Sequence, residues 1–165
     1  MADGGVSTMI MLVTALLITG SASAILIAEW SDATQRIRDS EQKAGEAADF
    51  DVSFAGDPMM VSYDTSATPD DELVFYLQNS GSGEMSTTFE VKVDGVTPST
   101  VSTNILPSGS DWFSGYLLEV TVADPSFAYS DGDDVALLYI GLSEPTLNGH
   151  VHSVVVNQEV RLDEV

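Results

Sequence analysis

The pattern of apolar and charged positions divides the chain into two parts. Between Asp3 and Glu29 lie 25 residues without a charge, and Val6 to Ala28 form the apolar stretch within them. A helix rises about 1.5 Å per residue, so this stretch can cross a hydrocarbon core of roughly 30 Å. We predict an N-terminal membrane anchor over residues 1–28. The residues expected in the membrane are Val6, Ile10, Leu12, Leu16, Leu17, Ile18, Ile25, Leu26 and Ile27, with Trp30 at its interface.

Hydroxyl and small side chains interrupt the predicted anchor. Serine and threonine hydroxyls can bond to carbonyls of their own helix or to a neighbouring helix. Gly20, Ala22 and Ala24 allow a second helix to approach closely. The composition therefore favours a helix that associates with others.

A cleaved signal peptide is the competing interpretation of the same segment. Ala22, Ser23 and Ala24 resemble the small-residue pattern before a cleavage site. However, no basic residue precedes the apolar run, and cleavage would leave Ile25 to Ile27 as an apolar end. We prefer an uncleaved anchor, with a merely buried helix as the remaining alternative.

Residues 29–49 predict a helical stalk. The segment has no proline, and Trp30, Ala33, Ile37, Ala44 and Ala47 recur at helical spacings among mixed charges. So few apolar positions make a weak heptad signal. A seam that faces a partner and a solvated single helix both remain open.

From Phe50 onward the apolar residues follow the period of strands. Phe50, Val52 and Phe54 alternate with polar residues, as do residues 89–93. Glycine, proline, asparagine and aspartate turn formers separate the runs. Six to eight short strands without a helical pattern predict an all-β, immunoglobulin-like antiparallel sandwich over residues 50–165. The other apolar runs are 72–78, 116–122, 135–142 and 150–162.

Charge limits the environment and the partners. The chain has 26 acidic against 5 basic residues, a net charge of -21, and residues 50–165 hold 19 acids and two bases. Nucleic acid is excluded as a likely partner class because phosphates require clustered cations. At 44% hydrophobic residues the chain is expected to fold. A folded domain this acidic predicts a halophile, where salt screens the repulsion.

Few residues suggest a metal-binding or catalytic site. His150 and His152 would share one face of a predicted strand, as a metal ligand pair, a pH-responsive interface or, as we prefer, a plain surface strand. Residues 130–134 could bind calcium, although the twelve-residue loop pattern is not met and we prefer a hairpin turn. The chain has no cysteine, nucleophile elbow or phosphate-binding loop. We expect no catalytic residues, no cofactor and no metal.

The sequence does predict a protein-binding surface. Trp112 and Phe113 follow a turn and would be costly to expose without purpose. Val154 and Val156 belong to a β-branched block that would be a liability at a sheet edge. We predict a partner interface at these four residues that uses apolar area and strand pairing, with charge contributing little at high salt. In the alternative, both aromatics fold back as a lid on the sandwich.

Several segments of the sequence resemble one protein family. These are an uncharged anchor without a processing site, a strand ending in Asn79-Ser80-Gly81, the run Phe89 to Gly95, Asp111-Trp112, and Leu118 to Val122 leading to residues 124–127. Together they resemble the archaellum (archaeal flagellum) stator family FlaG, also called ArlG. The likeness covers most of the chain, and the sister family FlaF (ArlF) shares the plan.

The resemblance implies a structural role without catalysis. It places the β-sandwich outside the cytoplasmic membrane, where it links the archaellum motor to the surface-layer protein as a homo- or hetero-oligomer. The basic residues Arg36, Arg38 and Lys43 would instead place the domain in the cytoplasm by the positive-inside rule. A pilin- or archaellin-like filament subunit is the nearest rival, although Asp3-Gly4-Gly5 lacks the basic residue of a peptidase site. An anchored binding protein of unknown ligand is the third alternative.

Overall fold

The computed structural model describes residues 3–67 and 69–165. It divides into two compact units, Met1–Ala44 and Gly45–Val165. The first unit is a single helix, and the second is an eight-stranded β-sheet domain that also contains the last turn of that helix. An N-terminal apolar helix followed by a mostly β domain is therefore confirmed.

Helix α1 extends from Asp3 to Ala47. No proline interrupts it, and hydroxyl side chains inside it bond to carbonyls of the preceding turn. Thr14 Oγ1 donates to the Ile10 carbonyl at 2.8 Å, and Thr19 Oγ1 donates to the Ala15 carbonyl at 2.7 Å. These two hydroxyls are satisfied within their own helix and need no polar neighbour.

The apolar part of α1 is long enough to cross a membrane by length and composition. Its most apolar window has a mean hydropathy of 2.3, and none of that window is buried by other parts of the chain. The nine predicted membrane residues and Trp30 all have exposed fractions between 59% and 77%. Such a continuous apolar surface is expected to be covered, and a lipid bilayer would cover it.

The β unit begins where the helix ends, and its strands differ in length and burial. The longer strands alternate between buried and more exposed positions, as the two-residue period predicts for β3 and β7. The strands are β1 (Val52–Ala55), β2 (Val61–Asp64), β3 (Glu72–Asn79), β4 (Met85–Val93), β5 (Thr100–Leu106), β6 (Leu117–Ala123), β7 (Asp134–Ser143) and β8 (Ser153–Glu164).

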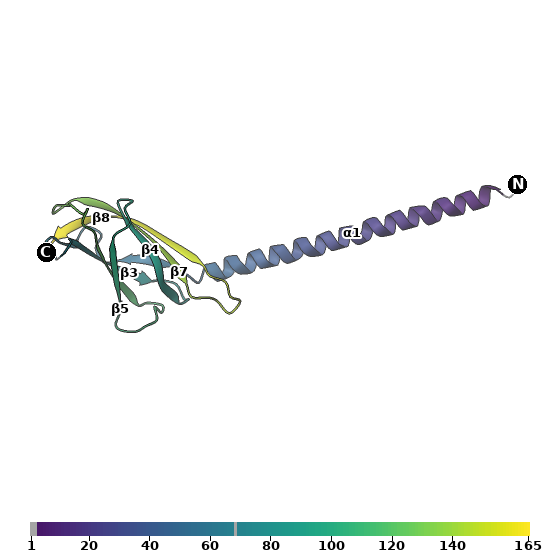
Figure 1. Ribbon diagram of the computed structural model, residues 1–165. Coiled ribbons are helices and arrows are strands. Elements are labelled where there is room, and N and C mark those ends of the chain that lie inside the picture. The colour runs from purple at the N-terminus through teal and green to yellow at the C-terminus, as the bar shows by residue number, and fades with distance from the viewer. Residues whose placement is uncertain (1–2, 68) are drawn as a thin grey trace. The chain divides into compact units, whose positions relative to one another are not determined.

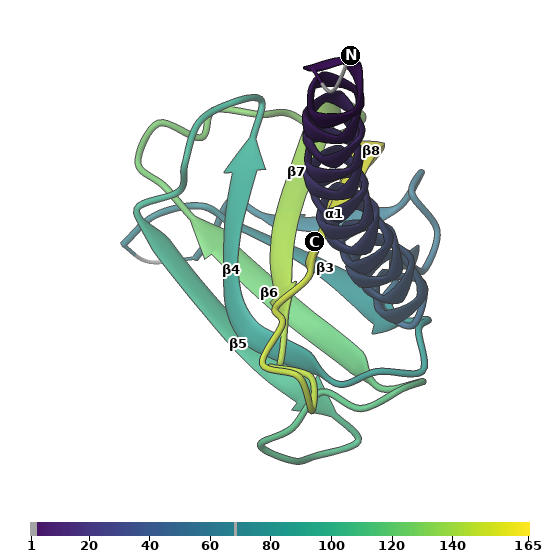
Figure 2. The same cartoon turned by 90° about the vertical axis from the view of Figure 1, so that its right-hand side faces the viewer.

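One continuous path of pairing connects the strands in the order β4-β7-β8-β2-β3-β6-β5, and β1 also pairs with β3. Figure 2 shows β4 beside β7 and β5 beside β6. The connection between the two halves is β8, which is antiparallel to β7 and then pairs in parallel with β2 at Val61 and Leu162. The sheet thus curls as a half-barrel. The immunoglobulin-like sandwich, which requires two separate sheets, stays a prediction.

The core lies between the two halves of the curled sheet. Leu73 and Leu77 from β3, Val120 from β6 and Leu137 from β7 are at most 4% exposed. Tyr139 lies among them, with its ring 5.3 Å from that of Phe89 and 6.3 Å from that of Trp112. Burial raises the pKa of the Tyr139 hydroxyl above its ordinary value. The core therefore draws on both halves, which makes the β unit one packing unit.

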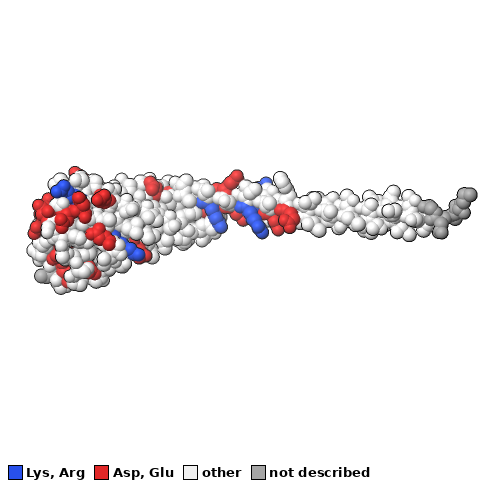
Figure 3. Space-filling view, turned by 90° about the horizontal axis from the view of Figure 1, so that it is seen from above, with Lys and Arg blue, Asp and Glu red and all other residues white. Residues whose placement is uncertain are grey.

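Acidic side chains form several patches on the surface of the β unit, whereas residues 5–28 of α1 carry no charge (Figure 3). Residues 50–165 carry two basic residues, Lys92 and Arg161. Lys92 pairs with Glu90 on its own strand at 3.2 Å. Most carboxylates in this range therefore repel one another, and the repulsion is limited mainly by the solvent's ions.

We expect the thermal stability of the β unit to rise with salt. Raising KCl from about 0.1 to 2 M shortens the Debye length to a few ångströms, and the melting temperature should rise by about 10 °C or more. Near-ultraviolet circular dichroism of the full chain in lipid nanodiscs would follow the buried aromatic residues. A melting temperature that does not change over this range would contradict the halophile interpretation.

Candidate functional site

The structure corrects the predicted position of Trp112. Its side chain is 0% exposed, and its indole Nε1 donates to the Tyr116 carbonyl at 2.9 Å. The Trp112 carbonyl accepts a hydrogen bond from Asn79 Nδ2, and its backbone forms a bridge with Met85. Trp112 is therefore a core residue and offers no surface to a partner.

Phe113 behaves differently from its neighbour. It is 46% exposed, and its ring contacts Tyr116 edge-on with the centroids 6.0 Å apart. The side chains of Trp112 and Phe113 therefore point in opposite directions, as successive side chains of an extended segment do. Only Phe113 remains available for the predicted interface.

The structure also shows which valines of β8 face outward. Val154 and Val156 are half-buried and pack against the core, so they face inward. Val155, between them, faces outward and is 60% exposed. β8 pairs with β2 only from Leu162 onward, so along Val154–Val156 its described pairing is with β7 alone, and the predicted open edge stands.

An apolar surface does occur on the outer face of β7. Val135, Leu137 and Tyr139 point into the core, and the alternate positions outward are also apolar. Ile140 lies opposite Val155 of β8 in the register. A strand that is apolar on both faces is typical of one covered on both faces. We define the β7 outer face as Ala136, Leu138, Ile140, Leu142 and Val155.

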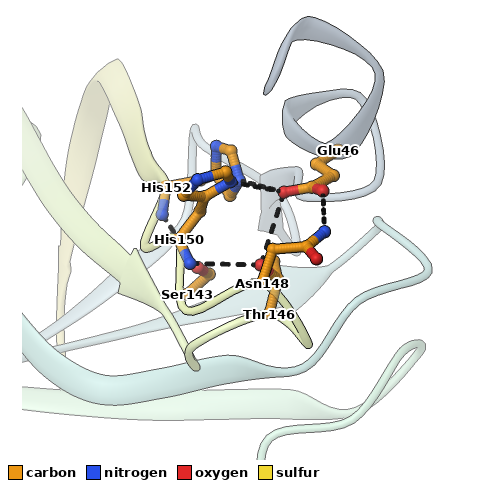
Figure 4. Close-up of polar contacts among 6 residues, drawn as sticks. All are labelled: Glu46, Ser143, Thr146, Asn148, His150 and His152. Carbon is orange, nitrogen blue, oxygen red and sulfur yellow. Dashed lines mark hydrogen bonds and ion pairs between the residues drawn. The ribbon is translucent and has the colours of Figure 1, made fainter. Parts of the chain in front are cut away.

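A second feature lies at the C-terminal end of α1, inside the β unit. Figure 4 shows the Glu46 carboxylate surrounded by side chains of the segment that connects β7 to β8. Its Oε2 lies 2.9 Å from Nδ1 of His150, and its Oε1 accepts from Asn148 Nδ2 at 2.6 Å. Thr146 Oγ1 also donates to Oε2, at 3.3 Å. We call Glu46, Thr146, Asn148, His150 and His152 the Glu46 cluster.

His152 completes the cluster from the core side. Its ring stacks on Phe50 with centroids 5.2 Å apart, and its Nε2 lies 3.7 Å from Glu46 Oε2. The backbones of His152 and Ser143 are bonded to each other at 2.8 Å, which fixes the start of β8. The side chain of His152 is 13% exposed and that of Glu46 is 17% exposed, so both are largely removed from water.

Close backbone packing holds the chain just after α1. The Asp49 carbonyl accepts from the amides of Ser82 and Gly83, both at 2.8 Å. A side chain at Gly81 would collide with the backbone at Asp49 and Asp51. Gly81 therefore allows the loop before β4 to contact the chain after α1. A shallow cavity of about 270 Å³ lies beside this contact, lined by Glu46, Asp49, Phe50 and Leu147 among others.

The two histidines do not lie on a strand as predicted, because β8 begins at Ser153. Among residues 3–67 and 69–165, no group of three or more histidine, aspartate or glutamate side chains is arranged to hold a metal ion. In the segment considered for calcium, the Asp133 carboxylate accepts from the Ser130 amide at 2.8 Å and closes a turn. The Asp133 carboxylate therefore has a role in the turn that does not require a calcium ion.

Sequence reasoning did not predict the part that Glu46 has in the cluster. In the sequence, Glu46 is one of several charged residues of the predicted helical stalk. It is separated from His150 by 104 positions. The pair His150 and His152 was the only part of the cluster that the sequence analysis singled out. Residue spacing could not identify Glu46 as the carboxylate that contacts it.

Comparison with known proteins adds little. No family model matches the chain, and no curated protein matches it. The crystal structure of the yeast GGA1 GAE domain is similar over 66% of this chain and 88% of that chain, with 12% identity and a TM-score of 0.30. So distant a likeness supports no statement about function.

Proposed function

We propose that this chain is a non-catalytic, membrane-anchored structural protein of the archaellum motor, with a stator-like role. The observation that carries the proposal is the charge-free apolar surface of α1, joined through one continuous helix to an acidic β domain. The resemblance to FlaG in residues 79–127 supplies the assignment to the archaellum. In this proposal the immunoglobulin-like domain lies outside the cytoplasmic membrane and links the motor to the surface layer.

The Glu46 cluster suits a protein that transmits force. A load on the anchor reaches the β unit through the backbone of α1, and Glu46 lies one residue before the helix ends at Ala47. At that point the carboxylate bonds to the segment between β7 and β8, and Asp49 bonds to the loop before β4. The load would therefore be shared between two loops.

The β7 outer face is the surface through which we propose that the domain binds the surface-layer protein. The five residues of this face carry no charge, and the charged residues that border it in the register are Glu90, Lys92 and Glu159. In concentrated salt, burial of apolar area remains effective whereas attraction between distant charges is screened. Leu142 and Val155 are its most exposed large residues, at 37% and 60%.

We expect the double variant Leu142→Ser/Val155→Ser to lose co-purification with the surface-layer protein and to swim poorly, because it removes apolar area from the face. Its melting temperature should stay within about 3 °C of wild type, since exposed positions contribute little to stability. The matched control, Asn157→Ser, alters an exposed position of β8 outside the defined face and removes little apolar area. Full co-purification by the first variant would reject this surface.

The location of the domain can be tested separately in intact cells. Protease added from outside, after the surface layer is loosened, should degrade the β domain while a cytoplasmic marker survives. Protection of the domain until lysis would agree with the basic residues at 36, 38 and 43 and would overturn the stator proposal. Purified filaments that contain the chain would instead support the pilin-like alternative.

A further inference from the structure

Strand β5 forms one end of the pairing path, and its outer edge is open. Among residues 3–67 and 69–165, β5 pairs with β6 and with no other strand. Figure 2 shows β5 at the margin of the sheet, beside β6. Five of its seven residues are exposed. An open edge of this kind presents unpaired backbone donors and acceptors to any strand that can reach it.

The register shows which backbone groups of β5 face outward. In an antiparallel ladder, the groups of successive residues point alternately to the two neighbours of a strand. The Asn79 amide donates to the Tyr116 carbonyl at 3.1 Å, so the even-numbered residues of β6 bond to β3 and its odd-numbered residues bond to β5. The latter pair with the even-numbered residues of β5. The N–H and C=O groups of Val101, Thr103 and Ile105 therefore point to the open edge.

β5 lacks the features that keep strand edges unpaired. Proteins protect such edges with charged side chains, with proline inside the strand or with bulges. β4, at the other end of the path, carries Glu90 and Lys92 and has a shift in its register. In contrast, the seven residues of β5 pair with β6 in unbroken register and carry no charge. The edge of β5 is therefore built to accept a further strand.

Charge argues for a second copy of this chain as the occupant of this edge. Two copies carry the same net charge of -21, so contact between their acidic surfaces is opposed by repulsion. Gly95 to Ser110 form the longest charge-free run in residues 50–165. Over β5 the register includes one charged residue of β6, Glu119, whose carboxylate accepts from the Tyr76 hydroxyl at 3.0 Å. Like-charged copies would meet least repulsion along this run.

The order of residues in β5 also lets the strand match itself. Read in either direction, residues 101–105 are apolar, polar, polar, polar and apolar. In an antiparallel pair centred on Thr103, Val101 of one copy would lie opposite Ile105 of the other. Thr103 would lie opposite itself on the two-fold axis, and cross-strand threonine pairs are favourable. Self-complementarity of this kind is what a two-fold interface requires.

A hollow beside β5 leaves room for the side chains of a second strand. A cavity of about 360 Å³ lies between β5 and β4, lined by Val101 and Thr103 on one side and by Phe89 and Val91 on the other. Val101 is on the same face of β5 as the buried Ile105, yet it is 41% exposed. In the pair centred on Thr103, Ile105 of the second copy would cover it.

We propose that two copies of this chain pair through β5, antiparallel and centred on Thr103, so that their sheets become continuous. The outward groups of Val101, Thr103 and Ile105 would form about six backbone hydrogen bonds between the two strands. A contact of this size is expected to be weak between free domains. The pairing does not involve the β7 outer face, and it does not depend on the archaellum assignment.

A single cysteine on the two-fold axis tests the pairing, because the chain has no cysteine of its own. The two Thr103 Cα atoms would lie about 5.5 Å apart, a distance that a disulfide spans. With a mild oxidant, full-length Thr103→Cys in liposomes at 2 M KCl should form at least about five times more disulfide-linked dimer than Thr100→Cys. Thr100 is exposed on the same strand, but its two copies would lie about 20 Å apart. Equal cross-linking of the two variants, or none in Thr103→Cys, would overturn the proposal.

The variants Thr103→Pro and Thr103→Ala separate backbone pairing from side-chain effects. Proline removes the outward N–H at the centre of the pair and leaves the bonds to β6 in place, whereas alanine keeps that N–H. By sedimentation equilibrium of the full chain in detergent micelles at 2 M KCl, the dimer dissociation constant should rise at least about tenfold for proline and less than about threefold for alanine.

The melting temperature of Thr103→Pro shows whether this variant folds, and the cysteine experiment decides alone if it does not. A wild-type chain that stays monomeric in the micelles would reject the pairing through β5. A folded Thr103→Pro chain that dimerises as tightly as wild type would reject it as well, because the central backbone bonds would then contribute nothing.

Discussion

Replacing Trp112 by Ala is expected to destabilise the β unit severely, whereas Phe113→Ala should have little effect. The Trp112 ring fills the core beside Tyr139, and its indole donates the hydrogen bond to the Tyr116 carbonyl. Removing a fully buried tryptophan costs about 3–5 kcal/mol, and the Tyr116 carbonyl would also lose one of its two donors, keeping the Asn79 amide. The melting temperature should fall by more than about 12 °C.

Far-ultraviolet circular dichroism of the full chain at 2 M KCl would measure both variants. Phe113 is the matched control because it is the next aromatic along the chain and is 46% exposed. If Trp112→Ala melted within about 3 °C of wild type, the indole would not be part of the core. If Phe113→Ala proved the more damaging change, the assignments of the two aromatics would have to be exchanged.

Two aspartates at the centre of the apolar stretch should release the chain from the membrane. Leu16 and Ile18 are 64% and 63% exposed, so they would face lipid. Each aspartate near the centre of a membrane helix costs about 2.5–3.5 kcal/mol. The double variant Leu16→Asp/Ile18→Asp should therefore appear in the soluble fraction after carbonate washing. Its β unit should stay folded, because the changes lie outside Gly45–Val165.

The control for this experiment introduces the same charges beyond the predicted anchor. Gln35→Asp/Ile37→Asp places two aspartates in the stalk segment, where water can solvate them, and this variant should stay with the membrane. An anchor variant that pellets like wild type would show that residues 6–28 are not what holds the chain to the membrane.

Local patterns predicted most of the secondary structure. The long charge-free run predicted the helix, and the apolar runs 72–78 and 135–142 predicted β3 and β7 closely. Strand β2 has four residues, and β5 has polar residues at four of its seven positions, so neither carries a strong periodic signal. The stalk was expected to reach residue 49, and the helix ends at Ala47.

The sequence by itself determined which segments are apolar, where the charge lies and that residues 50–165 form strands, because each of these depends on a residue and its near neighbours. Only the tertiary structure decided that Trp112 is core, that Val155 rather than Val154 faces outward, and that Glu46 meets His150. These outcomes depend on strand register and on how turns direct side chains. Both are set by packing between segments far apart in the chain, which spacing along the sequence does not encode.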